Sequence, residues 1–182
     1  YGIGYGSKLI KEINPCIVAG YSAGALVASL LVCSDFTIEH LLEVYNDAST
    51  FNKCGGISRF VTLMMDNLLP KDAHYKATNK LAIIVCDPNN NSKCKIISKW
   101  ESRDDLIKCL VASCYIPCMM ECLRITDERY QCRDAIFSND LPDVLDCFHM
   151  VVSYRPYMGF DLCRMCANLN ATSYDNTMSL VL

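Results

Sequence analysis

The stretch IVAGYSAGALVASLLVC, residues 17–33, decides how this sequence is interpreted. Residues 17–19 form a short apolar run of the kind that makes a buried strand, and ALVASLLVC, which begins after Gly24, has the composition of a helix. Between these two segments lies the pattern G-x-S-x-G, made by Gly20, Ser22 and Gly24. The stretch therefore predicts a strand, a tight turn and a helix, with a serine at the tip of the turn.

Ser22 has two possible roles in such a turn. A sharp turn from strand to helix forces its central residue into strained backbone geometry, and glycines at Gly20 and Gly24 would give the room that this requires. The first amides of the helix would point at the serine, and their partial positive charge favours a nearby alkoxide or oxyanion. Ser22 is then a nucleophile. In the alternative interpretation, the glycines only allow a strand and a helix to pack closely.

Length and composition indicate a globular protein. A chain of 182 residues fits one domain, which can bury about 70% of the surface that its unfolded form exposes. The chain is 52% hydrophobic and 20% charged with a net charge of −3, and it has no basic stripe, so nucleic-acid binding is not expected. No apolar run is long enough to span a bilayer.

The thirteen cysteines are an odd number without the regular loop spacing of a small secreted disulfide framework, which favours a reduced, cytoplasmic chain. Two spacings raise the alternative of a metal or redox module: Cys163-x-x-Cys166, and the series Cys114, Cys118 and Cys122. Zinc requires four ligands, and no second CxxC or pair of histidines completes either set. We therefore expect neither a metal nor another cofactor.

The hydrophobic pattern predicts alternating helices and strands, which is typical of an α/β fold. The expected helices are 5–14, 23–33, 37–48, 57–68 and 104–114, and the expected strands are 16–21, 80–87, 94–100, 119–125, 129–133 and 147–153. The segment SRDD before the last helix has the residues of a helix N-cap with acids in the first turn. Beyond residue 155 the pattern fades, so we expect a main domain over 1–155 and an irregular extension over 156–182. The sequence opens without methionine, which suggests a fragment.

A serine hydroxyl becomes a good nucleophile only when a base takes its proton. His40 and His74 lie in amphipathic or polar segments and are interpreted as surface or capping residues. The order Ser22, Asp134, His149 is that of an α/β-hydrolase, although FHMVVSY around His149 has the pattern of a buried strand. Asp134 ends a strand-like segment and precedes a turn, and a carboxylate can itself accept the proton. The residues alone leave both partners open.

Three separated segments resemble the patatin-like phospholipases, in particular the animal branch that contains adipose triglyceride lipase and adiponutrin. GYSAGALVA resembles the nucleophile elbow of that family, VASCYIP (residues 111–117) resembles its A-S-x-x-x-P segment, and YQCRDAIFSNDLP resembles the segment that carries its catalytic aspartate. LLPKDAHYKATNKLAIIV and KIISKWESRDDLIKCLVAS match in order and spacing. The resemblance spans about residues 1–155.

The resemblance implies a three-layer α/β/α fold with a mainly parallel central sheet and a Ser–Asp dyad that cleaves lipid esters. Carried onto the matching positions, Ser22 is the nucleophile, Asp134 is its base, and Ala23 offers its backbone N–H to the oxyanion, within the elbow formed by Gly20 and Gly24. The substrate would be a triacylglycerol or phospholipid at a membrane or lipid-droplet surface. The protein would be cytoplasmic, peripherally attached to that surface, and a protein activator is possible.

Two departures from the family pattern support a second hypothesis, a catalytically impaired protein that binds lipid or regulates a partner. The chain begins at Tyr1-Gly2-Ile3-Gly4, which matches only the trailing edge of the glycine-rich segment that forms the oxyanion hole of the family. In addition, Ala135 follows the aspartate where the family usually has glycine. If Ala135 had to adopt a positive φ or allow close backbone approach, its methyl group would displace Asp134.

Overall fold

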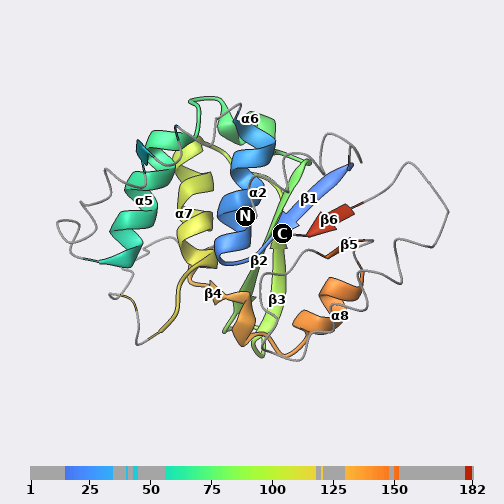
Figure 1. Cartoon of the computed structure of the whole chain (residues 1–182). Coiled ribbons are helices and arrows are strands. Elements are labelled where there is room, and N and C mark those ends of the chain that lie inside the picture. Colours follow the sequence, from blue (N-terminus) through green and yellow to red (C-terminus); the bar gives the residue numbers. More distant parts are fainter. Residues whose placement is uncertain are drawn as a thin grey trace.

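The computed structural model describes residues 15–34, 40, 43–44, 56–117, 120, 130–147, 150–151 and 179–181. These residues form an α/β fold in which a mixed sheet lies between helices, as the sequence predicts (Figure 1). The predicted helix 5–14, most of helix 37–48 and most of strand 119–125 lie outside the described residues.

The elements agree closely with the hydrophobic pattern in the first two thirds of the chain. The helices are α2 (Ala23–Cys33), α5 (Ile57–Leu68), α6 (Ala73–Ala77), α7 (Arg103–Ser113), the short 3-10 helix η3 (Ala135–Phe137) and α8 (Leu141–Asp146). The strands are β1 (Ile17–Gly20), β2 (Leu81–Asp87), β3 (Lys93–Ile97), β4 (Arg133–Asp134), β5 (Met150–Val151) and β6 (Ser179–Val181).

The sheet has the strand order β3-β2-β1-β6-β5, and β4 also pairs with β2. Three of the five pairings between described strands are parallel, namely β1 with β2, β1 with β6, and β5 with β6. The pairings of β2 with β3 and with β4 are antiparallel. The sheet is thus mainly parallel, and β2 and β3 form a hairpin at one edge of it.

Strand β2 is buried on both faces, which explains why its sequence LAIIVC is apolar without alternation. Leu81, Ile83 and Val85 pack into the larger core cluster, together with buried side chains of α2, α5, α6 and α7. Ala82 and Ile84 point to the opposite face and pack with side chains of η3 and α8. Helices therefore cover both faces of the sheet, which gives the three layers that the family resemblance implies.

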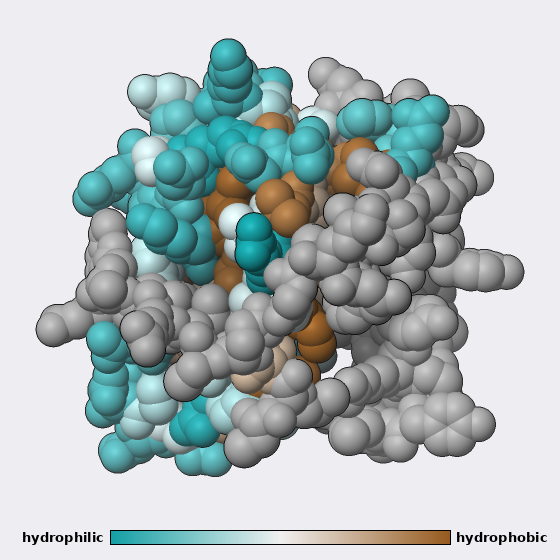
Figure 2. Space-filling view, turned by 90° about the vertical axis from the view of Figure 1, so that its left-hand side faces the viewer, coloured by the Kyte–Doolittle hydropathy of each residue, from teal (hydrophilic) through white to brown (hydrophobic). Residues whose placement is uncertain are grey.

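Helix α5 is amphipathic and forms one side of the molecule, the face shown in Figure 2. Val61, Met65 and Leu68 are buried against the larger core, whereas Leu63 is 41% exposed. Hydrophobic surface is visible on this face among hydrophilic residues (Figure 2). The apolar face of α5 thus packs into the hydrophobic core, whereas Leu63 lies outside that core.

Helix α7 begins at the predicted cap. The Ser102 hydroxyl accepts a hydrogen bond from the Asp105 amide at 3.1 Å, which satisfies one of the amides that the first helical turn leaves unpaired. The buried Asp105 carboxylate then accepts from the Tyr130 hydroxyl at 2.7 Å and from the Glu101 amide at 2.9 Å. This start fixes the direction of α7, which ends at Ser113.

The later strands differ most from the pattern. In the predicted strand 129–133, the described residues 130–132 are not in a strand, and β4 is Arg133–Asp134. In the predicted strand 147–153, Met150–Val151 form β5, and residues 148, 149, 152 and 153 lie outside the described residues. The segment expected to be irregular, 156–182, contains β6, which pairs with both β1 and β5. Since residues 152–178 lie outside the described residues, the division into a main domain and an extension remains a prediction.

Candidate active site

Ser22 has the backbone geometry of a sharp elbow. It follows β1 and occupies the N-cap position of α2 with φ 54° and ψ −135°. Residues other than glycine rarely adopt such angles, and the conformation costs on the order of 1–3 kcal/mol. The turn therefore holds the Ser22 side chain in a strained position between a strand and a helix, as the G-x-S-x-G pattern predicts.

Gly20 lets the strand approach the first turn of α2. A Cβ atom at Gly20 would lie 2.6 Å from the Gly24 carbonyl oxygen and 2.7 Å from the Ala25 nitrogen. Atoms in folded proteins do not come this close, so any side chain at this position would push β1 away from α2. The elbow thus requires glycine at position 20 for steric reasons.

The start of α2 presents backbone donors beside Ser22. The Ala25 amide donates to the Ser22 carbonyl oxygen at 3.0 Å. In the part of the chain that the structure describes, the amides of Ala23 and Gly24 have no hydrogen-bond acceptor. Donors at a helix N-terminus carry partial positive charge and suit an anionic oxygen. The two amides could therefore bind a developing oxyanion at Ser22.

Strand register brings Asp134 to the same place. β1 pairs with β2 up to Gly20 opposite Ile83, and β4 pairs with β2 from Asp134 opposite Val85. Because β3 occupies the other edge of β2 over Ile83–Asp87, β1 and β4 must share one edge, end to end. Gly20 lies opposite Ile83 and Asp134 opposite Val85, so the two residues are about 7 Å apart along that edge. Ser22 leaves the edge between the end of β1 and β4, and we call this place the strand junction.

Asp134 is held firmly at this junction. It is 2% exposed, and its amide donates to the Tyr115 carbonyl oxygen at 2.8 Å. Its Oδ1 accepts from the Ile136 amide at 3.0 Å, which fixes one carboxylate oxygen at the start of η3. Burial, and then the nearby charge of Asp134, raise the pKa of the Cys114 thiol to about 12. Cys114 is therefore a neutral neighbour of the carboxylate and a poor metal ligand.

Ala135 fits its position without strain. It is not among the described residues with positive φ, and it forms the first residue of η3. Its methyl group is fully buried and packs in the smaller core cluster with Ile84 and Leu141. The displacement of Asp134 that a methyl group could cause is therefore not observed.

Of the two histidines that the structure describes, His74 lies at the opposite end of β2 from Ser22. His74 lies on α6, which precedes the amino end of β2, whereas Ser22 and β4 lie at the carboxyl end of β2 (Figure 1). His40 is exposed and lies 3.8 Å from Glu43. His149 lies outside the described residues, so a role for it is not tested.

Sequence reasoning missed the contacts of Ser113. The Ser113 hydroxyl accepts a hydrogen bond from the Ser22 amide at 3.0 Å and donates to the Ile84 carbonyl oxygen at 3.1 Å. The only signal was its position in VASCYIP, one of the segments that carried the family resemblance. A buried serine at a helix end has no pattern that reveals its partner, because the partner lies far away in the sequence.

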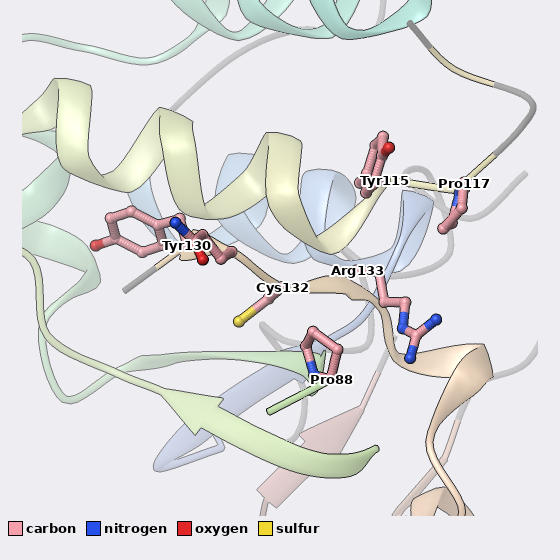
Figure 3. A pocket seen from close by; sticks show the side chains of 7 residues that line it. Pro88, Tyr115, Pro117, Tyr130, Cys132 and Arg133 are labelled. Carbon is pink, nitrogen blue, oxygen red and sulfur yellow. The ribbon is translucent and has the colours of Figure 1, made fainter. Parts of the chain in front are cut away.

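A pocket of about 280 Å³ lies beside β4. Its walls come from the turn after β2, the segment after α7 and the segment that enters β4 (Figure 3). The lining residues are Pro88, Tyr115, Pro117, Tyr130, Gln131, Cys132 and Arg133. Ser22 and Asp134 are not among these residues, although Arg133 precedes Asp134 in the chain.

Two expected absences can be examined only for part of the chain. Among the described residues, no group of three or more His, Cys, Asp or Glu side chains is arranged to hold a metal ion. Cys118, Cys122, Cys163 and Cys166 lie outside these residues. None of the helices seen in the described ranges has the length and apolar character needed to cross a membrane.

Comparison with known proteins finds curated relatives that are 28–32% identical to this chain over the aligned residues. The chain is 31% identical over 127 residues to the human patatin-like phospholipase domain-containing protein 4, a match that covers 62% of this chain and 47% of that protein. It is 32% identical over 108 residues to the omega-hydroxyceramide transacylase of Mus musculus, covering 54% of this chain and 18% of the relative. It is 28% identical over 185 residues to patatin-like phospholipase domain-containing protein 2 of Rattus norvegicus, covering 93% of this chain and 38% of the relative.

The chain thus spans less than half the length of each of these relatives. No family model and no solved structure matches the chain. The fold class, the elbow and the named relatives agree with the family that the three sequence segments resemble. The chain is similar in sequence to the patatin-like phospholipase domain-containing proteins.

Proposed function

We propose that this protein is a serine lipid acyl hydrolase that cleaves carboxylic esters of triacylglycerols or phospholipids, with Ser22 as nucleophile and Asp134 as base. The observation that carries the proposal is the strained elbow at Ser22. This elbow directly follows β1, and β4, which carries Asp134, continues along the same edge of β2 where β1 ends. Strained backbone persists where the surroundings enforce it, and it is frequent at catalytic nucleophiles.

The proposed reaction has two steps. Asp134 takes the hydroxyl proton of Ser22 while Oγ attacks the ester carbonyl carbon, and the resulting oxyanion accepts a hydrogen bond from the Ala23 amide. The ester C–O bond then breaks, and the leaving alcohol takes the proton from Asp134, which leaves an acyl-enzyme. In the second step Asp134 deprotonates a water molecule, which attacks the acyl carbon. The bond between this carbon and Ser22 Oγ then breaks, Asp134 returns the proton to Oγ, and the fatty acid leaves.

An alcohol could replace water in the second step. One relative of this chain is named omega-hydroxyceramide transacylase, a name that denotes acyl transfer to an acceptor other than water. The same acyl-enzyme and the same base serve either acceptor, because Asp134 would deprotonate an alcohol as it deprotonates water. Transacylation is therefore the second candidate activity of the same site.

The hypothesis of a catalytically impaired lipid-binding protein loses one of its two supports. It relied on a strained Ala135, and Ala135 fits within η3 without positive φ. Its other support, the glycine-rich segment, concerns residues 1–4, which lie outside the described residues.

We further propose that the protein acts peripherally from the cytoplasm, at the surface of a membrane or lipid droplet, and that a protein activator is possible there. Ile136 and Phe137 follow Asp134 and Ala135 in the chain and are 41% and 40% exposed. Apolar side chains beside a buried carboxylate suit contact with a lipid surface, since that contact removes them from water.

Labelling with a fluorophosphonate probe, which reacts only with activated serines, tests the proposed function. We expect the wild-type protein to be labelled, Ser22→Ala to be unlabelled, and Asp134→Asn to be labelled at least about a hundredfold more slowly, because the base is lost. Ser29→Ala is a matched control on α2, since Ser29 is buried and its hydroxyl donates to the Leu26 carbonyl oxygen.

The labelling should be run on this chain and on the longest form of the protein that can be purified. Folded wild-type protein that is not labelled in either form would contradict the hydrolase proposal and favour the lipid-binding hypothesis. Wild-type protein that has not been treated with the probe, incubated with a radioactive ester with and without an added long-chain alcohol, would then separate hydrolysis from transacylation.

A further inference from the structure

Ser113 joins three segments that are far apart in the sequence. It is the last residue of α7 and is fully buried. Its hydroxyl contacts the Ser22 amide at 3.0 Å and the Ile84 carbonyl oxygen at 3.1 Å. One side chain thus connects the end of α7, the elbow and β2.

The direction of both hydrogen bonds is determined by their partners. A backbone N–H can only donate and a backbone carbonyl can only accept, whereas a serine hydroxyl has one donor and two acceptor positions. The Ser113 hydroxyl therefore donates its proton to the Ile84 carbonyl oxygen, and a lone pair of its oxygen accepts the Ser22 amide. The contact with Ile84 thereby orients the contact with the elbow.

Ile84 needs this partner because of the strand junction. It lies between Ile83, which pairs with Gly20 of β1, and Val85, which pairs with Asp134 of β4. On this edge of β2, β1 ends opposite Ile83 and β4 begins opposite Val85, so neither strand is paired with Ile84. A buried carbonyl oxygen without a hydrogen-bond donor is unfavourable, and the Ser113 hydroxyl supplies that donor.

The chain just after α7 also holds the backbone of Asp134. Tyr115, two residues after Ser113, accepts the hydrogen bond of the Asp134 amide at 2.8 Å. Ser113 and Tyr115 thus fix the backbone of Ser22 and of Asp134 from one short stretch. A shift of this stretch would move both groups.

We propose that Ser113 is a positioning residue of the elbow and that it sets the geometry of Ser22 relative to Asp134 and the Ala23 amide. This inference rests on the proposed function of Ser22. By occupying the Ser22 amide, Ser113 keeps that donor away from the substrate and helps hold the strained φ of 54°. The Ala23 amide is then the donor that faces the oxyanion.

Ser113→Ala tests the proposal. The substitution removes both hydrogen bonds, and we expect the rate of fluorophosphonate labelling at Ser22 to fall by about tenfold to a hundredfold, because catalysis is sensitive to small misplacements. With a soluble nitrophenyl ester, kcat should fall by the same factor while KM changes little, since Ser113 does not contact substrate. Ser113→Cys keeps the approximate volume but bonds weakly, and we expect a rate between those of Ser and Ala.

Two controls separate positioning from a general loss of stability. Val61→Ala opens a cavity in the core at α5, away from the elbow, and should lower the melting temperature without lowering kcat. Ser29→Ala removes a buried hydroxyl elsewhere on α2 and should leave labelling unchanged. If Ser113→Ala does not fold, Ser113→Cys decides the question.

The outcomes distinguish this inference from the function on which it rests. Wild-type protein that is not labelled contradicts the proposed function. Labelled wild-type protein together with folded Ser113→Ala or Ser113→Cys that is labelled at the wild-type rate overturns the role of Ser113 alone. A fall in labelling that Val61→Ala reproduces at equal melting temperature would also overturn it.

Discussion

Strain at Ser22 is offset by the residues around it. Gly20 allows the close approach of β1 to α2, and Ser113 binds the Ser22 amide. Neither contact would be needed if the chain passed from strand to helix with ordinary backbone angles. The local sequence thus supports a backbone conformation at Ser22 that costs free energy.

Ala135 provides a test at the scale of one residue. We expect Ala135→Gly, the change toward the residue that the family usually has, to destabilise the protein by about 1–2 kcal/mol, because it removes a buried methyl group and increases the entropy of the unfolded chain. Urea unfolding measures this difference. An unchanged or raised midpoint would show that the methyl group is not accommodated as the structure describes.

At the scale of elements, α7 is fixed at both ends. Its first turn is held by Ser102, by the hydrogen bond from Tyr130 to Asp105, and by contacts of Arg103 with Asp66 and Leu69 of the α5 end. Its last turn holds Ser22 and Asp134 through Ser113 and the chain that follows. The helix thus links the α5 side of the molecule to the candidate site.

Tyr130→Phe tests the first of these anchors. Loss of the hydroxyl leaves the buried Asp105 carboxylate with one donor fewer, and we expect the free energy of unfolding to fall by about 1.5–3 kcal/mol. Tyr75→Phe is the matched control, because Tyr75 is 76% exposed, and its effect should stay within about 0.5 kcal/mol. Equal denaturation midpoints for the two variants would refute the anchor.

The elements that sequence could predict are those whose pattern is local and long enough. Helices α2 and α5 have the predicted bounds, since eleven or twelve residues contain three turns of periodicity. Helix α6 has five residues and offers too short a pattern, and β6 has a partner, β1, at the opposite end of the chain. The G-x-S-x-G pattern predicted the elbow, but the preference for Asp134 as base depended on the family resemblance.

At the scale of the whole molecule, the sheet joins distant parts of the chain. β6 lies between β1 and β5 and pairs with both in parallel, so Ser179–Val181 separates the elbow strand from the far edge. A strand with neighbours on both sides uses its backbone donors and acceptors in two ladders. The stability of β1, and with it the position of Ser22, thus depends on residues near the end of the sequence.

Proline substitutions in β6 test this dependence. Leu180 pairs with Val18 and Met150, and Leu180→Pro removes a ladder donor inside the sheet, so we expect a loss of about 3 kcal/mol or more. Ser179→Pro changes the first residue of the strand, where proline is better tolerated, and should cost less. Circular dichroism during urea unfolding compares the two, and equal losses would argue against β6 as an interior strand.

The sharing of one edge of β2 by β1 and β4 has a consequence for folding. Ser22 and Asp134 come to the same edge of β2 only after segments from near the start and from the last third of the chain have both docked on β2 in the correct register, and such distant pairings close slowly. A slip of β4 by one residue would turn the carboxylate to the opposite face of the sheet. The rate at which labelling of Ser22 by the probe appears during refolding should therefore report when the sheet is complete. The circular dichroism signal of the helices should appear earlier.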